Sequence, residues 1–235
     1  ELVPTRVQQP AILATSVAYF AALNELGRLP QPTYVAGHSL GQYSALVAAG
    51  SLDVGDAARL VHRRGELMEE HGLGGMVAVI GLDRAQLVEI ARQSGAEIAN
   101  VNAPGQTTLS GRTENLETAS DLAKEAGARR VIPLPVNGAF HSSLMQPVAD
   151  ALWEDIQHVE MQEPSVPLMA NVDARPLTSP DDLRAELRDH ITRSVQWIDI
   201  VEQAHALGVT EFYEVGPGKV LSGLAPRIVK GVSTV

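Results

Sequence analysis

The segment Gly37-His38-Ser39-Leu40-Gly41 has the G-x-S-x-G spacing of a serine nucleophile held on a sharp turn between a strand and a helix. An apolar run precedes it and an Ala/Leu-rich helical pattern follows it. The nucleophile of such a turn has a strained backbone, and we expect Gly37 and Gly41 to be needed because side chains there would collide with the neighbouring strand or helix. The segment therefore predicts covalent catalysis by Ser39, against the alternative of a plain glycine-rich turn.

The backbone of the same turn can also stabilise negative charge. Because Ser39 opens a helix, the N–H of Leu40 has no partner within that helix and lies at the positive end of the helix dipole. A donor at this position can hold the oxyanion that forms when a serine attacks a carbonyl carbon. We therefore expect Leu40 to supply half of an oxyanion hole.

A serine hydroxyl needs a base, and the chain offers seven histidines. His141 is the best candidate, because it lies where a loop returns to the main sheet and opens a helix. Structural and catalytic interpretations of His141 both remain open at this point. His38 is adjacent to Ser39 on a tight turn, so we expect it to pack or to hydrogen-bond at the substrate site. The others are expected to be solvated on charged helix faces or loops: His62, His71, His158, His190 and His205.

The composition limits the functional classes. The 235 residues are 45% hydrophobic and carry a net charge of −10 without a Lys/Arg tract, which argues against a nucleic-acid partner. There is no cysteine, and no His/Asp/Glu cluster has metal-ligand spacing, so neither a thiol nucleophile nor a metal is expected. No apolar run approaches the ~20 residues that cross a bilayer, and the amino terminus does not resemble a signal peptide. We expect no membrane association and a cytoplasmic location.

The pattern of elements predicts an α/β fold. A helix over residues 9–26 is followed by a strand at 34–36 that leads into the Ser39 turn, and Asp53 is expected to cap a helix over 54–70. Later segments read as helix, strand, helix, helix and strand, which indicates a parallel sheet covered on both faces. Their expected bounds are 142–159, 166–171, 180–192, 197–207 and 210–215.

The middle of the chain has a different pattern. Residues 75–136 alternate as strand, helix, strand, strand, helix, strand, with short Gly/Pro/Asn turns between them. This βαββαβ order is that of the ferredoxin-like split-βαβ motif. We expect a small inserted subdomain over 75–138, and a large subdomain formed by 1–74 and 139–235.

Four segments carry a resemblance to a known family. They are Gly37–Leu46, Val61–Met68, Gly138–Met145 and Tyr213–Leu221, and they occur in the family's order over nearly the whole chain. In this respect the sequence resembles the malonyl-CoA:acyl-carrier-protein transacylases of fatty-acid and polyketide synthesis. The resemblance implies an α/β-hydrolase-like large subdomain with a ferredoxin-like small one.

The resemblance also implies a reaction. Ser39 would take the malonyl group from malonyl-CoA with His141 as base, and the phosphopantetheine thiol of an acyl carrier protein would then collect it, in ping-pong order. Arg64 matches the arginine that grips the malonyl carboxylate, and Phe140 matches a bulky residue that crowds an α-methyl branch. A backbone carbonyl orients the histidine in this family, here assigned to Gln196. No permanently bound cofactor is implied.

Two departures from the family pattern stand out. Family members begin with a strand and a Phe-Pro-Gly-Gln-Gly type loop that supplies the second oxyanion donor, whereas this chain begins downstream of both. We therefore hypothesise that it is a fragment of a longer polypeptide or is completed by another segment. The second departure is Gln42, where the family usually has glutamate, and we expect local hydrogen bonding with little consequence.

Two other functions remain open from the sequence. An α/β-hydrolase, such as a thioesterase or lipase, would pass the acyl group to water, but its H-G-G-G loop is not found in this chain. The other alternative is a non-catalytic domain that docks acyl carrier protein. The carrier of this family is acidic, so docking would need a local basic patch, for which the candidates are Arg129, Arg130, Lys219, Arg227 and Lys230.

Overall fold

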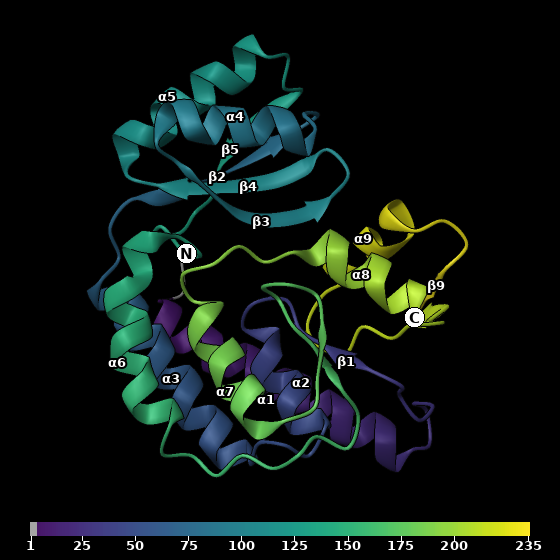
Figure 1. The fold of residues 1–235 in the computed structure, drawn as a ribbon. Helices are drawn as coiled ribbons and strands as arrows, with labels where there is room; N and C mark the ends of the chain where they lie inside the picture. Colours follow the sequence, from purple (N-terminus) through teal and green to yellow (C-terminus); the bar gives the residue numbers. More distant parts are fainter. Residues whose placement is uncertain (1–3) are drawn as a thin grey trace.

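A computed structural model describes residues 4–235, and Glu1–Val3, where the expected large subdomain starts, lie outside the described residues. The chain folds as a mixed α/β protein, which confirms the expected class. Figure 1 shows a small unit, from residue 75 to residue 133, seated on a main unit formed by the chain on either side of it. None of the helices in the described part is long and apolar enough to cross a membrane.

The main unit is largely helical. Its longest helices, α1 and α3, pack against each other, and α6 lies against α3. The Asp53 carboxylate caps α3 by accepting hydrogen bonds from the N–H groups of Gly55 and Asp56. The helices of this unit are α1 (Thr5–Glu25), α2 (Gly41–Ala48), α3 (Val54–Glu70), α6 (Gln146–Ile156), α7 (Pro180–Asp189), α8 (Trp197–Ala206) and α9 (Val220–Ile228), with a 3₁₀ turn at Ser143–Met145.

The strands of the main unit are shorter than the sequence predicts. β1 (Val35–Ala36) pairs in parallel with β6 (Leu168–Met169), but β7 (Pro176–Leu177) pairs with β6 in the antiparallel sense. A tight turn with Ala174 at φ +60° returns the chain from β6 to β7, so the expected all-parallel sheet is wrong for this edge. A separate parallel pair joins β8 (Glu211–Phe212) to β9 (Ser233–Thr234).

The small unit has the expected βαββαβ order. Its strands are ordered β3-β4-β2-β5, with every neighbouring pair antiparallel. Helices α4 and α5 cover the face that points away from the main unit, and β3 is the strand nearest to it (Figure 1). The bounds are β2 (Gly75–Ile80), α4 (Arg84–Ser94), β3 (Glu97–Ala103), β4 (Gln106–Gly111), α5 (Thr113–Glu125) and β5 (Arg130–Pro133).

Each unit has its own apolar core, and the two are joined by polar contacts and by a third apolar cluster, in which Ala103 of β3 packs with residues of β6, α8 and α9. Residues from α1, α2, α3, α6 and α7 build the main core, whereas β2, β4, α4 and α5 build the small one. β3 is tied to the main unit by reciprocal backbone hydrogen bonds, from Val101 N–H to Val195 O and from Val195 N–H to Ala99 O, each 2.9 Å. This junction lies beside the end of β1, where the Ser39 turn begins.

Candidate active site

The Ser39 turn has the strained geometry that the sequence predicts. Ser39 has φ +53°, a left-handed conformation that costs a non-glycine residue on the order of 1–3 kcal/mol. A Cβ at Gly37 would lie 1.9 Å from the backbone carbon of Gly41, so Gly37 must lack a side chain. At Gly41 a Cβ would meet nothing within 4 Å, so the expectation that both glycines are sterically required is wrong for Gly41.

The structure brings His141 to Ser39. The Ser39 hydroxyl lies 2.8 Å from His141 Nε2, although the two residues are 102 positions apart. His141 Nδ1 lies 2.6 Å from the backbone carbonyl oxygen of His190. A carbonyl only accepts, so Nδ1 carries the proton and Nε2 presents a lone pair to the hydroxyl. This is the tautomer that a general base needs.

The prediction that the Gln196 carbonyl orients His141 is wrong. His190 supplies the carbonyl, whereas the Gln196 side chain accepts a hydrogen bond from Arg84 and its N–H donates to Asn171 O. The reason is that α7 ends at Asp189 and His190 is its C-cap, where carbonyls are left without helical partners.

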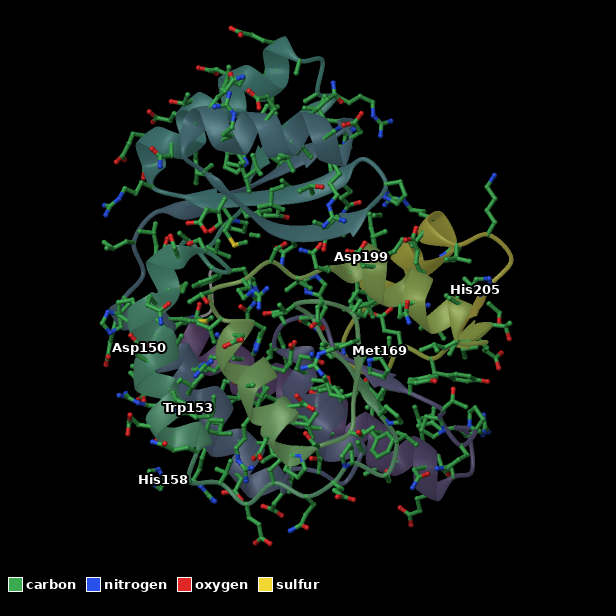
Figure 2. The ribbon with its side chains drawn as sticks, viewed as in Figure 1. Asp150, Trp153, His158, Met169, Asp199 and His205 are labelled. Carbon is green, nitrogen blue, oxygen red and sulfur yellow. The ribbon has the colours of Figure 1, made fainter. Side chains whose placement is uncertain are left out.

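His190 is also less exposed than expected. It is fully buried, whereas His62, His158 and His205 are exposed as predicted. Figure 2 shows His158 and His205 at the outer edges of the molecule.

The surroundings of His141 keep its ring neutral. Burial, and secondly the positive charge of Arg64, lower the pKa of His141 to about 3. The imidazole is therefore available as a base far below its ordinary titration range.

Arg64 lies directly at the nucleophile. Its side chain projects from α3 and is only 3% exposed; Nη2 donates to the Ser39 hydroxyl over 2.9 Å, and Nη1 donates to Gln9 Oε1 over 2.5 Å. No carboxylate lies within 4 Å of the guanidinium in residues 4–235, and its Nε–H has no partner there. Arg63 points elsewhere, toward Glu66, as expected. Arg64 is thus a buried cation without an anionic partner among residues 4–235.

The remaining predicted residues surround this centre. The N–H of Leu40 makes no hydrogen bond within the described residues and stands at the start of α2, as an oxyanion donor must. His38 Nε2 lies 2.9 Å from Asn102 Oδ1 on β3, and its ring lies 5.5 Å from that of Trp197. Phe140 is half-buried against the main core. His38 therefore links the turn to the small unit.

Sequence reasoning missed four residues that hold the site together: Gln9, Asn171, Glu186 and His190. Gln9, Asn171 and His190 bond to the three site residues from distant parts of the chain, Glu186 bonds to Asn171, and no local motif marks any of them. The double glutamine at positions 8 and 9 offers no pattern that distinguishes a site residue from a surface one.

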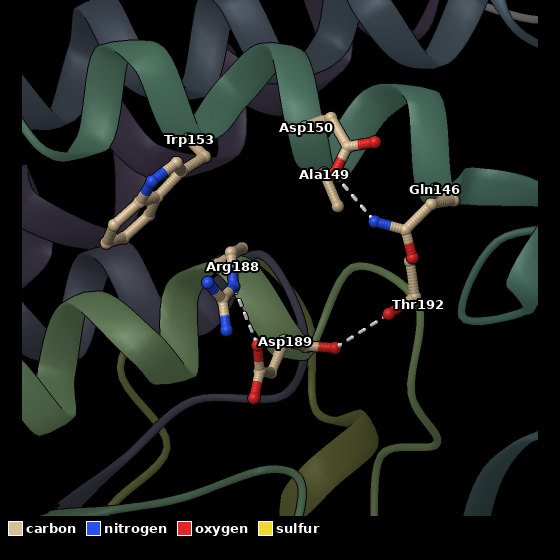
Figure 3. A pocket seen from close by; sticks show the side chains of 7 residues that line it. All are labelled: Gln146, Ala149, Asp150, Trp153, Arg188, Asp189 and Thr192. Carbon is tan, nitrogen blue, oxygen red and sulfur yellow. Dashed lines mark hydrogen bonds and ion pairs between the residues drawn. The ribbon is translucent and has the colours of Figure 1, made fainter.

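A cavity of about 460 Å³ opens beside His141, between the two units. Residues of α4, β3 and the segment 192–196 line it. A second groove, of about 240 Å³, lies between α6 and α7 (Figure 3). Its charged groups are paired within it, Arg188 with Asp189 and Asp150 with Gln146, and neither Ser39 nor His141 lines it. Of these two cavities, the first is the one that His141 lines. No cluster of three metal-ligating side chains occurs in the described chain.

Comparison with known proteins identifies relatives over the full length of the chain. The acyl transferase domain family matches residues 1–229. The malonyl CoA-acyl carrier protein transacylase of Bacillus subtilis is 42% identical over 243 residues, covering all of this chain and 76% of the relative. The Escherichia coli K12 protein of the same name is 43% identical, covering 97% and 76%.

Solved structures agree with this assignment. An acyl carrier protein S-malonyltransferase from Vibrio cholerae has 41% identity and a TM-score of 0.95, covering 99% of this chain and 78% of that one. A malonyl-transacylase in complex with its type II PKS acyl-carrier protein has 39% identity and a TM-score of 0.95, covering 98% and 77%. The resemblance inferred from four motifs is thus confirmed, and the chain belongs to the malonyl-CoA:acyl-carrier-protein transacylase family of acyl transferase domains.

Proposed function

We propose that this chain transfers a malonyl group from malonyl-CoA to the phosphopantetheine thiol of acyl carrier protein, through a malonyl ester of Ser39. The observation that carries the proposal is the buried Arg64 guanidinium, which donates to the Ser39 hydroxyl and has no carboxylate partner among residues 4–235. A planar guanidinium binds a carboxylate through two parallel hydrogen bonds. A malonyl carboxylate would supply the missing counter-charge at the nucleophile.

The first half of the reaction loads the serine. The Ser39 oxygen attacks the thioester carbonyl carbon while His141 Nε2 takes the hydroxyl proton. The carbon–sulfur bond then breaks, and the proton on His141 passes to the coenzyme A sulfur as it leaves. Throughout, the His190 carbonyl accepts the hydrogen bond from His141 Nδ1–H and so keeps the imidazole ring aligned with Ser39.

The second half of the reaction removes the malonyl group from Ser39. The carrier thiol enters from the cavity beside His141 and gives its proton to Nε2 as its sulfur attacks the ester carbonyl carbon. The bond between that carbon and the Ser39 oxygen breaks, and the proton returns from His141 to Ser39. Coenzyme A leaves before the carrier enters, so the kinetics are ping-pong.

We assign the oxyanion of both tetrahedral intermediates to the Leu40 N–H, on the strength of its place at the first turn of α2. His38 would shape the acyl site through its bond to Asn102, and Phe140 would limit bulk beside His141. A methyl misfit is worth roughly 1–3 kcal/mol, so methylmalonyl should be disfavoured and not fully excluded.

Finer features of the family description are also proposed. We describe the small unit as ferredoxin-like, with bounds 75–138, and the rest as an α/β-hydrolase-like subdomain, supported by the strand order β3-β4-β2-β5 and by the Ser39 turn between β1 and α2. The proposed reaction involves no permanently bound cofactor. A cytoplasmic location stays a prediction.

The two alternatives are less well supported. A thioesterase or lipase acting on neutral acyl chains would leave the Arg64 charge buried without a partner, which is costly. A non-catalytic docking domain would not need the 2.8 Å contact between Ser39 and His141 or the strain at Ser39.

Intact-protein mass spectrometry tests the proposal. The chain is mixed briefly with malonyl-CoA, alongside Ser39→Ala, and a phosphopantetheinylated acyl carrier protein is then added. We expect a malonyl adduct that requires Ser39 and moves to the carrier. An adduct lost only to water would indicate a hydrolase, and no adduct would contradict catalysis by this chain.

A further inference from the structure

The side chain of Gln42 lies buried beneath the Ser39 turn and is fully hydrogen-bonded. Its Oε1 accepts from Gly37 N–H over 3.2 Å, and its Nε2 donates to Met169 O over 3.2 Å and to Glu186 Oε1 over 3.0 Å. Met169, labelled in Figure 2, ends strand β6. The site thus presents one donor and two acceptors, a set that an amide satisfies and a carboxylate does not. The local hydrogen bonding expected of Gln42 is confirmed, and its complete pairing argues that the residue matters more than the sequence suggested.

Glu186 is the unusual member of this set. It is only 6% exposed, and no Lys, Arg or His lies within 4 Å of its carboxylate in the described chain. Burial raises its pKa. Its Oε1 accepts from Gln42 and, over 2.5 Å, from the backbone N–H of Asn171. A buried carboxylate without a cation is costly, and here N–H donors alone compensate for it.

Asn171 carries the connection to the nucleophile. It is fully buried; its Nδ2 donates to Gly37 O over 2.7 Å, and its Oδ1 accepts from Ser39 N–H over 2.7 Å. Gln42 and Asn171 together therefore bind both backbone groups of Gly37 and the N–H of Ser39. Within residues 4–235, Glu186 is the one side chain hydrogen-bonded to both Gln42 and Asn171, and it reaches them from α7.

We propose that Glu186 and Gln42 form a matched positioning pair that fixes the strained backbone of Ser39, so that the hydroxyl meets His141 and Arg64. Neither residue touches the substrate. The effect on malonyl transfer rests on the function proposed above, but the effect on the nucleophile does not. The donor and acceptor pattern requires the amide on α2 and an acceptor oxygen at position 186 on α7.

Two substitutions of similar volume separate positioning from packing. Glu186→Gln keeps an acceptor oxygen for Asn171 and Gln42, whereas Glu186→Met fills the space without one. Asp181→Asn, on the same helix with a fully exposed side chain, is the control. The probe is a fluorophosphonate, whose phosphorus bonds to the Ser39 oxygen as fluoride leaves and His141 takes the proton.

We expect Glu186→Met to slow labelling of Ser39 by roughly 10–100-fold, the loss that a misplacement of about 1 Å can cause. The labelling rate of Glu186→Gln should stay within about threefold of wild type. The kcat for malonyl transfer should fall in parallel, with KM nearly unchanged because Arg64 is not displaced. Backbone hydrogen exchange of residues 37–42 should accelerate in Glu186→Met and not in Glu186→Gln. Equal labelling and equal exchange in the Met and Gln variants would overturn the pair.

Exchange of the two groups gives a second, independent test. Gln42→Glu places two carboxyl groups in contact, and one of its oxygens faces Met169 O, so Ser39 labelling should be slow. Adding Glu186→Gln removes the contact between two carboxyl groups and should recover part of the loss, as coupled neighbours do, while the oxygen that faces Met169 O prevents full recovery. Purely multiplicative losses would contradict the pair. Wild-type chain that reacts with the fluorophosphonate but forms no malonyl adduct would refute the proposed function alone.

Discussion

The guanidinium of Arg64 donates a hydrogen bond of 2.9 Å to the hydroxyl of Ser39, the group that also lies 2.8 Å from His141 Nε2. One oxygen is thus held between the cation and the base. A carboxylate that binds Arg64 removes that donor from Ser39 and neutralises a charge that lowers the pKa of His141. An anionic acyl group would then free the nucleophile and strengthen its base, which links substrate selection to catalysis.

Replacement of Arg64 should reverse the preference for an anionic acyl group. We expect Arg64→Ala to lower kcat/KM for malonyl-CoA by roughly 10²–10³, the order found when a charged hydrogen-bonded pair loses one partner, and to raise the relative rate with acetyl-CoA. Arg63→Ala is a matched control because its side chain is 42% exposed and pairs with Glu66. Steady-state kinetics with both thioesters checks this, and an unchanged malonyl/acetyl ratio would exclude Arg64 as the carboxylate clamp.

The pH profile of Ser39 acylation should lack the usual histidine step. His141 has a pKa of about 3, so it is neutral and competent as a base throughout the range from pH 8 down to 5.5. The profile of kcat/KM, which reports the free enzyme, should therefore be flat within about twofold over that range. Rapid-quench measurement of the malonyl adduct provides the data. A fall with an apparent pKa near 6.5 would mean that His141 is not held in the environment described.

The stability of the fold should decrease on mild acidification. Burial lowers the pKa of His141 and His190, so the unfolded chain binds protons below about pH 6.5 that the native state refuses. Each can remove about 1 kcal/mol of stability between pH 7.5 and 5.5, or roughly 2–4 °C in Tm for a chain of this size. Glu186, whose pKa is raised, opposes the trend because its contribution is lost as pH rises. Calorimetry of wild type and His190→Gln checks the sign, and the variant should have the shallower slope.

The two glycines of the serine turn should differ sharply in tolerance. Gly37→Ala forces a methyl group against the backbone of Gly41 and should prevent folding or greatly lower Tm. Gly41→Ala meets open space at the start of α2 and should be neutral or stabilising by about 0.5–1 kcal/mol. Thermal melts of the pair provide the comparison. Similar melting temperatures would contradict the packing described.

The parts of the fold that the sequence predicted are those with local signals. Helix α3 runs over 54–70 as expected, because Asp53 caps a strongly amphipathic segment. Helix α9 was missed because a Gly-Pro-Gly run precedes it and it contains Gly223 and Pro226, which normally weaken helices. Strands β7 and β9 have two residues each, too short for an alternating pattern to show.

The candidate site divides in the same way. Ser39 was identified by the residue types and spacing of its motif, His141 was the best of seven candidate bases, and Arg64 was identified from the family resemblance. No motif marks their supporting residues: Glu186 meets Gln42 across 144 positions, and His190 acts through a backbone carbonyl, which no side-chain pattern encodes. These contacts depend on the three-dimensional position of the end of α7, which no local sequence pattern indicates.

Both proposed catalytic residues, Ser39 at φ +53° and His141 at φ +59°, adopt backbone conformations that L-amino acids disfavour. The native state is therefore less stable than a chain of this shape could be, and two of the three non-glycine residues with positive φ in residues 4–235 are the proposed nucleophile and base. Glycine adopts a positive φ without strain, so Ser39→Gly should have a higher melting temperature than Ser39→Ala. Equal melting temperatures would show that no such strain exists. The fold tolerates this strain because Ser39 and His141 lie in turns, outside the helices and strands.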